Sequence, residues 1–352
     1  MFDIVGKRYW FYLISAIVVV PGLISLILFG LHFSIDFTGG SILELQFEES
    51  GVVQPAELRA LYGEYGFGDT MVQSSQEDIF LVRSKTLDSE TKNTIQREIE
   101  ERFGAFTELR FESVGPSVGG EVQRRAYLVV GMAAVAILIY ISFAFRHVTK
   151  PVRYGACAII AMVHDIFVVV GLASIFGVLY GWEVDALFLT ALLTVIGFSV
   201  HDSIVVFDRI RENSRRYAGL PIEDVVNHSI IQTLDRSINT QLTVIFTLTA
   251  LLLFGGVTIR HFVLTLLIGI ISGTYSSIFN ASPLLVEWER RPDLLIYALS
   301  FLVPPVGAAV GLFLWVRARE TSRPWARGCF VAAAIGAACI GGLLLLTRVI
   351  PS

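Results

Sequence analysis

The sequence has little charge. Only 16% of its 352 residues are Asp, Glu, Lys or Arg, whereas 54% are hydrophobic. A soluble domain carries about 25% charged residues, so this composition predicts an integral membrane protein. The net charge of -4 is too small to indicate a nucleic-acid partner. The aromatic residues also lie in apolar runs, without the interleaved Lys and Arg that a nucleic-acid site needs.

Cysteine is scarce as well, and motifs of enzyme chemistry are missing. Each of the three cysteines lies in an apolar segment: Cys157, Cys329 and Cys339. None has the spacing of a metal site or a redox pair, so we expect small core residues and no metal. The polar stretch 34–124 has no cysteine, nucleophile motif or phosphate loop, and its Gly39-Gly40 pair lacks the rest of a dinucleotide fingerprint. The sequence therefore predicts neither an enzyme nor a cofactor.

Long hydrophobic runs are abundant. A membrane-spanning helix needs about 20 mainly apolar residues. Six runs before residue 290 meet that need: 10–32, 126–145, 154–178, 184–207, 238–255 and 261–286. The first follows Lys7 and Arg8, as a signal peptide would, but it lacks a short apolar core with a small-residue cleavage site. We interpret it as a retained anchor.

Lys and Arg concentrate in alternate connections between these runs. They occur at the N-terminus, in 146–153, in 208–236 and at 290–291, whereas 179–185 has none and 256–260 has only Arg260. Because short loops rich in Lys and Arg stay in the cytoplasm, the N-terminus is predicted to be cytoplasmic and residues 34–124 extracytoplasmic. The predicted parts are an anchor helix (1–33), an extracytoplasmic domain (34–124), a five-helix membrane domain (125–290) and an additional C-terminal part (291–352).

The C-terminal part contains two more apolar segments, 294–316 and 328–346. The first is interrupted by Pro304-Pro305. The connection between them carries four arginines: Arg317, Arg319, Arg323 and Arg327. Two full spans would place these arginines outside, against the positive-inside rule, whereas a re-entrant first segment would keep them inside. We favour a hydrophobic hairpin of two spans, because both segments are long enough.

Residues 41–114 show strand, helix, strand, strand, helix and strand patterns in that order. Residues 41–47 alternate apolar and polar side chains, while 55–65 and 89–103 place apolar residues at helical spacing. This order predicts an α+β ferredoxin-like domain, which gives a fold and no activity. The domain ends at Gly39-Gly40 and Gly115-Pro116. We expect backbone turns there, with hinges as the alternative.

Two His-Asp pairs lie inside predicted membrane helices, at His164-Asp165 and at His201-Asp202. An ionisable group at that depth costs about 2.5–3.5 kcal/mol by insertion scales, so such residues usually face a bundle interior and mark ion or proton paths. The alternative is an inert buried polar contact. The pattern predicts a proton relay that includes both pairs.

Polar stripes also run along the fourth and fifth predicted membrane helices. Arg236, Thr240 and Thr243 recur on one face of a helix that we expect to begin near Arg236, and Thr194 shares a face with His201. Arg236 joins the predicted relay, while Thr194, Thr240 and Thr243 are predicted to line it. The threonines alone could instead bond to the backbone of their own helices.

Six motifs carry a family resemblance, and they occur in the family's order across residues 1–290. They are Ile35-Asp-Phe-Thr-Gly-Gly40, Val114-Gly-Pro-Ser-Val-Gly119, Val163-His-Asp165, Val200-His-Asp-Ser-Ile-Val-Val-Phe-Asp-Arg-Ile-Arg-Glu-Asn213, Leu253-Phe-Gly-Gly256 and Gly269-Ile-Ile-Ser-Gly273. With them the chain resembles the SecD/SecF family of the resistance-nodulation-division superfamily. The resemblance implies an α-helical polytopic membrane protein that forms one six-helix half of a transporter.

The same resemblance implies a function and partners. Such a subunit pairs with SecD in the lipid bilayer of the bacterial cytoplasmic (inner) membrane. The pair uses the proton-motive force to help exported preproteins leave the Sec translocon channel (SecYEG). In the family, the positions that match Asp202 and Arg236 matter for proton conduction. His201 stands where many members have Asn, which would alter the pH response.

Two other functions remain open at this point. Half of a proton-driven small-molecule or lipid exporter would have a larger outer domain with an apolar pocket. An intramembrane aspartyl protease would need Asp165 and Asp202 close enough to share a proton. Arg236 as an ion-pair partner of Asp202 argues against the protease.

Overall fold

The computed structural model describes residues 2–48, 53–76, 78–146, 151–256 and 259–290, so the predicted C-terminal hairpin lies outside the described residues. The chain divides into two compact units. The sheet unit comprises residues 31–133 and 180–190. The helical unit comprises residues 1–30 and 134–179 and those from Ala191 onward.

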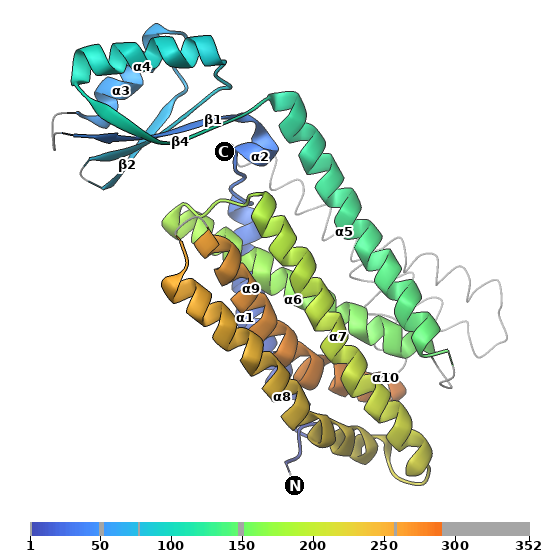
Figure 1. The fold of residues 1–352 in the computed structure, drawn as a ribbon. Coiled ribbons are helices and arrows are strands. Elements are labelled where there is room, and N and C mark those ends of the chain that lie inside the picture. The colour runs from blue at the N-terminus through green and yellow to red at the C-terminus, as the bar shows by residue number, and fades with distance from the viewer. Residues whose placement is uncertain (1, 49–52, 77, 147–150, 257–258, 291–352) are drawn as a thin grey trace, which may run out of the picture. The chain divides into compact units, whose positions relative to one another are not determined.

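Within the described part of the chain, six helices are long and apolar enough to cross a membrane, as the sequence predicted. They are α1 (Arg8–Phe29), α5 (Pro116–Ala144), α6 (Pro151–Tyr180), α7 (Ala186–Arg216), α8 (Ile222–Phe254) and a last span that starts with α9 (Arg260–Ser276). A π-helical turn (Ser277–Ala281) joins α9 to α10 (Ser282–Arg290). Figure 1 shows these helices, and together they confirm a polytopic membrane protein.

The start of α8 differs from the prediction. The helix begins at Ile222, not near Arg236. Glu223 and Asp224 occupy its first turn, where acidic side chains favour the positive end of the helix dipole. Val226 and Ile230 are buried on one side of this segment. This segment is therefore an amphipathic extension of the helix. A search for continuous apolar runs misses it and so places the start of the helix too late.

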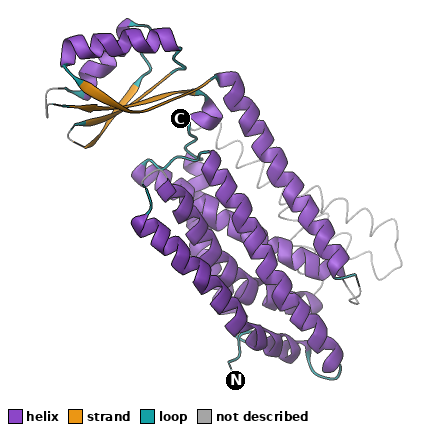
Figure 2. Cartoon of the chain, viewed as in Figure 1, coloured by secondary structure: helices purple, strands orange, loops and turns teal. Residues whose placement is uncertain are grey.

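The sheet unit contains a four-stranded antiparallel sheet in the order β2-β3-β1-β4. In chain order the elements are β1 (Gly40–Phe47), α3 (Pro55–Glu64), β2 (Met71–Gln76), β3 (Ile79–Ser84), α4 (Ser89–Phe103) and β4 (Phe106–Val114). Leu43 of the central strand β1 pairs with Val82 of β3 and with Phe111 of β4. The predicted ferredoxin-like arrangement is thereby confirmed (Figure 2).

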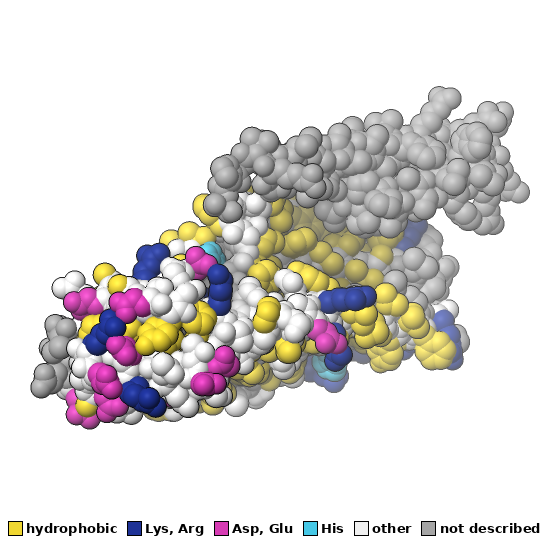
Figure 3. Space-filling view, turned by 90° about the horizontal axis from the view of Figure 1, so that it is seen from above, with side chains coloured by type: hydrophobic (Ala, Val, Ile, Leu, Met, Phe, Trp, Pro, Cys, Tyr) yellow, Lys and Arg dark blue, Asp and Glu magenta, His cyan; other side chains and the backbone are white. Residues whose placement is uncertain are grey.

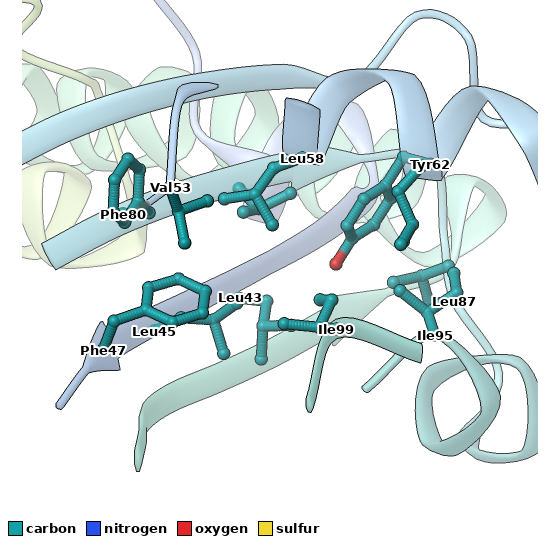
Figure 4. Packing of buried hydrophobic residues seen from close by; sticks show 12 residues of the cluster. Leu43, Leu45, Phe47, Val53, Leu58, Tyr62, Phe80, Leu87, Ile95 and Ile99 are labelled. Atoms are coloured by element: carbon teal, nitrogen blue, oxygen red, sulfur yellow. The ribbon is translucent and has the colours of Figure 1, made fainter. Parts of the chain in front are cut away.

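The core of the sheet unit lies between one face of the sheet and helices α3 and α4. Figure 4 shows Leu45 and Phe47 of β1 pointing toward the same layer as Ile99 of α4 and Leu58 of α3. The Phe47 ring centroid lies 5.6 Å from that of Phe80. Burial of a side chain of this size stabilises a fold by roughly 1.5–3 kcal/mol, so this cluster gives the sheet unit a core of its own.

The surfaces of the two units differ in composition. In Figure 3, acidic and basic side chains are scattered over the sheet unit, whereas hydrophobic side chains cover much of the visible surface of the helices. The exposed hydrophobic residues of α1 include Trp10, Ile17 and Phe29. Such a surface suits lipid, so it agrees with the membrane assignment.

Small residues hold the helical unit together. A Cβ atom added to Gly22 of α1 would lie 2.8 Å from the Gly171 Cα atom of α6, so the two backbones are nearly in contact. Close by along both helices, the Ser25 and Ser174 hydroxyls form a 2.9 Å hydrogen bond. This is the packing expected where lipid supplies no hydrophobic driving force between helices.

A buried ion pair connects the two ends of the described helical unit. Arg8 of α1 donates from Nε and Nη2 to Glu287 Oε2 of α10, at 3.0 Å in each case, and about a tenth of each side chain is exposed. The prediction from sequence used Arg8 only as a topology signal. Its pairing with Glu287 fixes the first helix against the last described one.

Candidate functional site

Asp165 lies at the centre of a cluster of hydroxyl groups. Its side chain is on α6 and is 1% exposed. Ser199 of α7 and Ser276 of α9 each donate to Oδ2 at 2.6 Å, and Ser272 of α9 donates to Oδ1 at 2.6 Å. His164 Nδ1 lies 3.0 Å from Oδ1. The carboxylate thus has four hydrogen-bond partners from three helices, which makes its burial in a membrane tolerable.

Glycine at position 273 permits this cluster. Ser272 and Ser276 are four residues apart, so they share a face of α9. A Cβ atom on Gly273 would lie 3.3 Å from the Ser199 Cα atom and 3.7 Å from Asp165 Oδ2. The missing side chain therefore lets α9 approach α7 and Asp165 closely enough for the serine hydroxyls to reach the carboxylate.

Asp202 is also a buried carboxylate, and its environment differs from that of Asp165. It lies on α7 with 4% of its surface exposed. Gln241 Nε2 of α8 donates a hydrogen bond to Asp202 Oδ2. The neighbouring His201 is exposed. Figure 1 shows α7 and α8 running alongside each other, and this bond joins them within the apolar part of the chain.

Arg236 does not occupy the position that we expected from the sequence. It lies on an exposed face of α8, and in the part of the chain that the structure describes it forms no hydrogen bond or ion pair with Asp202. Five residues separate it from Gln241, which corresponds to about 140° around the helix. Gln241, and not Arg236, therefore faces Asp202 in this chain. The role of Arg236 in proton conduction stays a prediction.

The predicted lining threonines lie on exposed faces. Thr240 and Thr243 donate from their hydroxyls to the carbonyl oxygens of Arg236 and Thr240, at 2.8 and 2.7 Å. Thr194 is exposed on α7, on the same face as His201. We call these faces the exposed polar stripes. The stripe of α7 comprises Thr190, Thr194, Gly197 and His201, and that of α8 comprises Arg236, Asn239, Thr240, Thr243 and Thr247.

The sequence contained a signal for Gln241 that we did not use. Ser229, Thr233, Ser237 and Gln241 recur every four residues along α8, and all four are buried. Polar side chains at that spacing in a membrane helix indicate a face turned toward other helices. The prediction from sequence instead used the threonines of the exposed stripe, on another side of the helix. The buried stripe carries the contact with Asp202.

The predicted hinge residues form two junctions that contact each other. Gly39 and Gly40 have φ angles of 74° and 127°, which residues other than glycine rarely adopt. A Cβ atom on Gly39 would lie 2.6 Å from the Pro116 Cα atom, and one on Gly119 would lie 2.7 Å from the Gly39 nitrogen. The chain after Gly115 therefore packs directly on the Gly39-Gly40 turn. Movement at this turn stays a prediction.

Two carboxylates cap the start of α7 inside the sheet unit. Asp185 accepts from the Phe188 N–H at 2.6 Å, and Asp36 accepts from the Ala186 N–H at 2.9 Å. Asp36 belongs to α2 (Ile35–Thr38), a short helix that the sequence patterns did not predict. Next to it, Phe33 and Val184 form a parallel bridge. The first turn of α7 is thus bound to the segment that leads into β1.

Comparisons with known proteins agree with this architecture. The family model "Protein export membrane protein SecD/SecF, C-terminal" matches residues 94–291, and "SecD/SecF GG Motif" matches residues 24–50. The protein translocase subunit SecF of Anaerolinea thermophila is 55% identical over 291 residues, which cover 82% of this chain and 94% of that protein. SecF of Thermobaculum terrenum is 52% identical over 309 residues, covering 84% and 97%.

A solved structure extends the similarity to the fold. The crystal structure of SecDF from Thermus thermophilus, described as a translocon-associated membrane protein, superposes with a TM-score of 0.71 at 35% sequence identity. The match covers 82% of this chain and 39% of SecDF, so the chain corresponds to less than half of that longer protein. With the family model and these relatives matching most of its length, the chain belongs to the SecF group of the SecD/SecF family of protein export membrane proteins.

Proposed function

We propose that this chain is an auxiliary subunit of the Sec protein-export machinery, which works with SecD to promote the passage of preproteins from the SecYEG channel across the bacterial cytoplasmic membrane. The proton-motive force is the proposed energy source. Support comes from relatives that are named protein translocase subunit SecF and from a SecDF relative in which one chain carries both names. In this proposal the chain is not an enzyme, because its relatives are translocase subunits.

The observation that carries the proton-driven part is the buried Asp202. One elementary charge that crosses a potential of 100 mV releases about 2.3 kcal/mol, which is enough to bias a conformational equilibrium. Asp202 would bind and release the proton at the α7–α8 contact. Asp165, His164 and His201 would complete the relay, and Arg236 would stabilise charge on the path.

The exposed polar stripes support a partner in the membrane. Arg236 and the threonines of α8 would be costly against hydrocarbon, and so would His201 on α7. Transporters of this kind usually place their path between two related halves. SecD would supply the second half, covering both stripes so that Thr194, Thr240 and Thr243 line the path between the subunits.

The proposed topology follows the distribution of Lys and Arg. The N-terminus would lie in the cytoplasm, residues 1–33 would anchor the chain, residues 34–124 would lie outside the cytoplasm, and 125–290 would form the remaining spans. A small-molecule exporter would need a larger outer domain with a substrate pocket. Residues 31–133 instead contain one small domain whose apolar side chains, such as Leu58 and Ile99, fill its own core.

Substitution of Asp202 tests the proposal. Asp202→Asn keeps the size of the side chain and one acceptor oxygen for Gln241, but it removes the charge and cannot take up a proton. We expect the variant to assemble with SecD and to lose the stimulation of preprotein export by the proton-motive force, measured in energised membrane vesicles. Asp208→Asn is the matched control, because Asp208 is exposed on the same helix, where it pairs with Arg211. Full stimulation by the Asp202 variant would refute the proton-driven mechanism.

A further inference from the structure

The amide of Gln241 uses only half of its hydrogen-bonding capacity. The side chain is 2% exposed, and its Nε2 atom donates to Asp202. Its Oε1 atom is buried and has no hydrogen-bond partner among the described residues. A buried carbonyl oxygen without a partner is unfavourable and therefore uncommon in native structures. The unused acceptor lies on the same terminal group that already contacts the candidate proton carrier.

Asp202 needs different partners in its two protonation states. An ionised carboxylate can only accept hydrogen bonds, so it requires an N–H or O–H donor. A protonated carboxyl group also carries an O–H that requires an acceptor. A primary amide offers both on one planar group, and the terminal torsion of Gln turns through a broad, two-fold potential. Rotation by half a turn would bring Oε1 to the place that Nε2 occupies.

The other ionisable groups near Asp202 do not offer this second partner. Each oxygen of Asp165 on α6 already has two hydrogen-bond partners. His201 is exposed on the stripe of α7, and Arg236 lies on the exposed face of α8. Gln241 is therefore the described side chain that is placed to serve Asp202 both with and without a proton.

We infer that Gln241 is a positioning residue that follows the protonation state of Asp202. Its NH2 group holds the ionised carboxylate, and after the amide has turned, Oε1 accepts the hydrogen bond of the protonated acid. This inference rests on the proposed function, because it assumes that Asp202 takes up a proton. Protonation of Asp202 on α7 is thereby transmitted to α8, the helix that carries Arg236 and the longer exposed polar stripe.

The test uses the full-length chain with SecD in proteoliposomes and infrared difference spectra between acidic and neutral pH. We expect a carbonyl band of protonated Asp202 together with a side-chain amide band of Gln241. Gln241→Leu should remove the amide band and move the acid band to higher wavenumber. It should also lower proton-driven export about tenfold or more, the scale of one lost hydrogen bond to a charged group. Gln241→Asn, whose side chain carries the same amide and is one methylene shorter, should restore part of the amide band and part of the export rate.

A matched control is available on the same helix. Gln232 lies outside the apolar part of α8, where it bonds to Arg209 and Asn213. Gln232→Leu should leave the Asp202 band and the export rate unchanged. If Gln241→Leu leaves the acid band in place, or if no amide band depends on pH, the amide is a fixed donor and our inference is wrong. If Asp202→Asn removes no carboxyl band, Asp202 does not titrate, and the proposed function fails together with the inference.

Discussion

At the scale of single residues, the buried carboxylates of Asp165 and Asp202 are held in different ways. Asp165 has four partners on three helices, so any displacement of it disturbs several contacts at once. Asp202 is bonded to one amide on one neighbouring helix. A group that must gain and lose a proton repeatedly needs an environment that can rearrange. This contrast is the reason why we assign the proton carrier to Asp202 and a supporting role to Asp165.

Substitution of His201 should change the pH dependence of export. The imidazole lies next to Asp202 in the chain and on the exposed stripe, and the ordinary pKa of histidine, about 6.5, is close to physiological pH. We expect His201→Asn to shift the pH optimum of proton-driven export without abolishing it. His228→Asn, in the amphipathic extension of α8, serves as the control. An unchanged profile for the His201 variant would mean that the imidazole has no part in the relay.

The stability of the sheet unit should depend on Asp88 in acid. Asp88 caps α4, and the hydrogen bond from the Thr91 N–H, at 2.7 Å, holds its pKa below the ordinary value. A lowered pKa means that the ionised form stabilises the fold. This contribution is present above the unfolded-state pKa of about 3.9 and is lost as the pH falls through the folded-state value.

Asp88→Asn keeps a capping oxygen but cannot titrate. We expect hydrogen exchange of the α4 amides, corrected for the intrinsic effect of pH, to be similar in both proteins at neutral pH. Below about pH 4, protection should fall in the wild type by more than in the variant. An equal fall in both proteins would assign the acid response to other groups.

At the scale of helices and strands, the sequence predicted the elements well and their contacts poorly. All six spans follow from the length of their apolar runs, because lipid surrounds them, and the ferredoxin-like order follows from apolar periodicity, because burial against a sheet face imposes it. The cluster around Asp165 could not be derived in this way. Ser199 and Ser276 lie 34 and 111 residues away along the chain, so only the packing of three helices brings them to the carboxylate.

Gln241 was missed for a related reason. A helical wheel of α8 has two polar sides, one ending at Gln241 and one containing Arg236. Periodicity alone does not tell which side faces the same chain and which faces a partner. The four-residue spacing that ends at Gln241 marks a polar side of α8, but a single sequence does not show which of the two sides faces Asp202.

The contact between α1 and α6 gives a prediction at this scale. Gly22→Ala would force a methyl group into the Gly171 backbone, so we expect a loss of about 1–3 kcal/mol, the usual cost of overpacking. Gly131→Ala is the matched control on α5, because a Cβ atom there meets nothing within 4 Å. The control should be neutral or more stable by up to about 1 kcal/mol, since Ala favours helix over Gly. Thermal unfolding in detergent measures both, and equal effects would contradict the close packing of α1 on α6.

At the scale of the whole molecule, the proposal requires the sheet unit to respond to the membrane site. The candidate hinges at Gly39-Gly40 and Gly115-Pro116 are the places where the chain passes between strands and helices. Hinge motions usually occur at such element-terminal residues. We therefore expect that proton-driven export needs freedom at these two junctions.

Cross-linking tests this expectation. After replacement of Cys157, Cys329 and Cys339 by alanine, engineered cysteine pairs would join the sheet unit to the membrane helices. Oxidation should stop proton-driven export, and reduction of the same sample should restore it, so that each sample serves as its own control. Export at the full rate in the oxidised state would show that the sheet unit is a passive platform and that the junctions are static turns.

The cap of α7 by Asp36 has a consequence for the order of synthesis. Asp36 and Ala186 are 150 residues apart, so the Asp36 carboxylate does not meet this N–H donor until α5 and α6 have both been made. At about 5–20 residues per second, the ribosome needs roughly 8–30 s to add that length of chain. The sheet unit includes residues 180–190, so it too stays incomplete during this interval. The folding of this unit is therefore tied to the insertion of the later helices, and a nascent chain that stops before residue 186 leaves Asp36 without the helix that it caps.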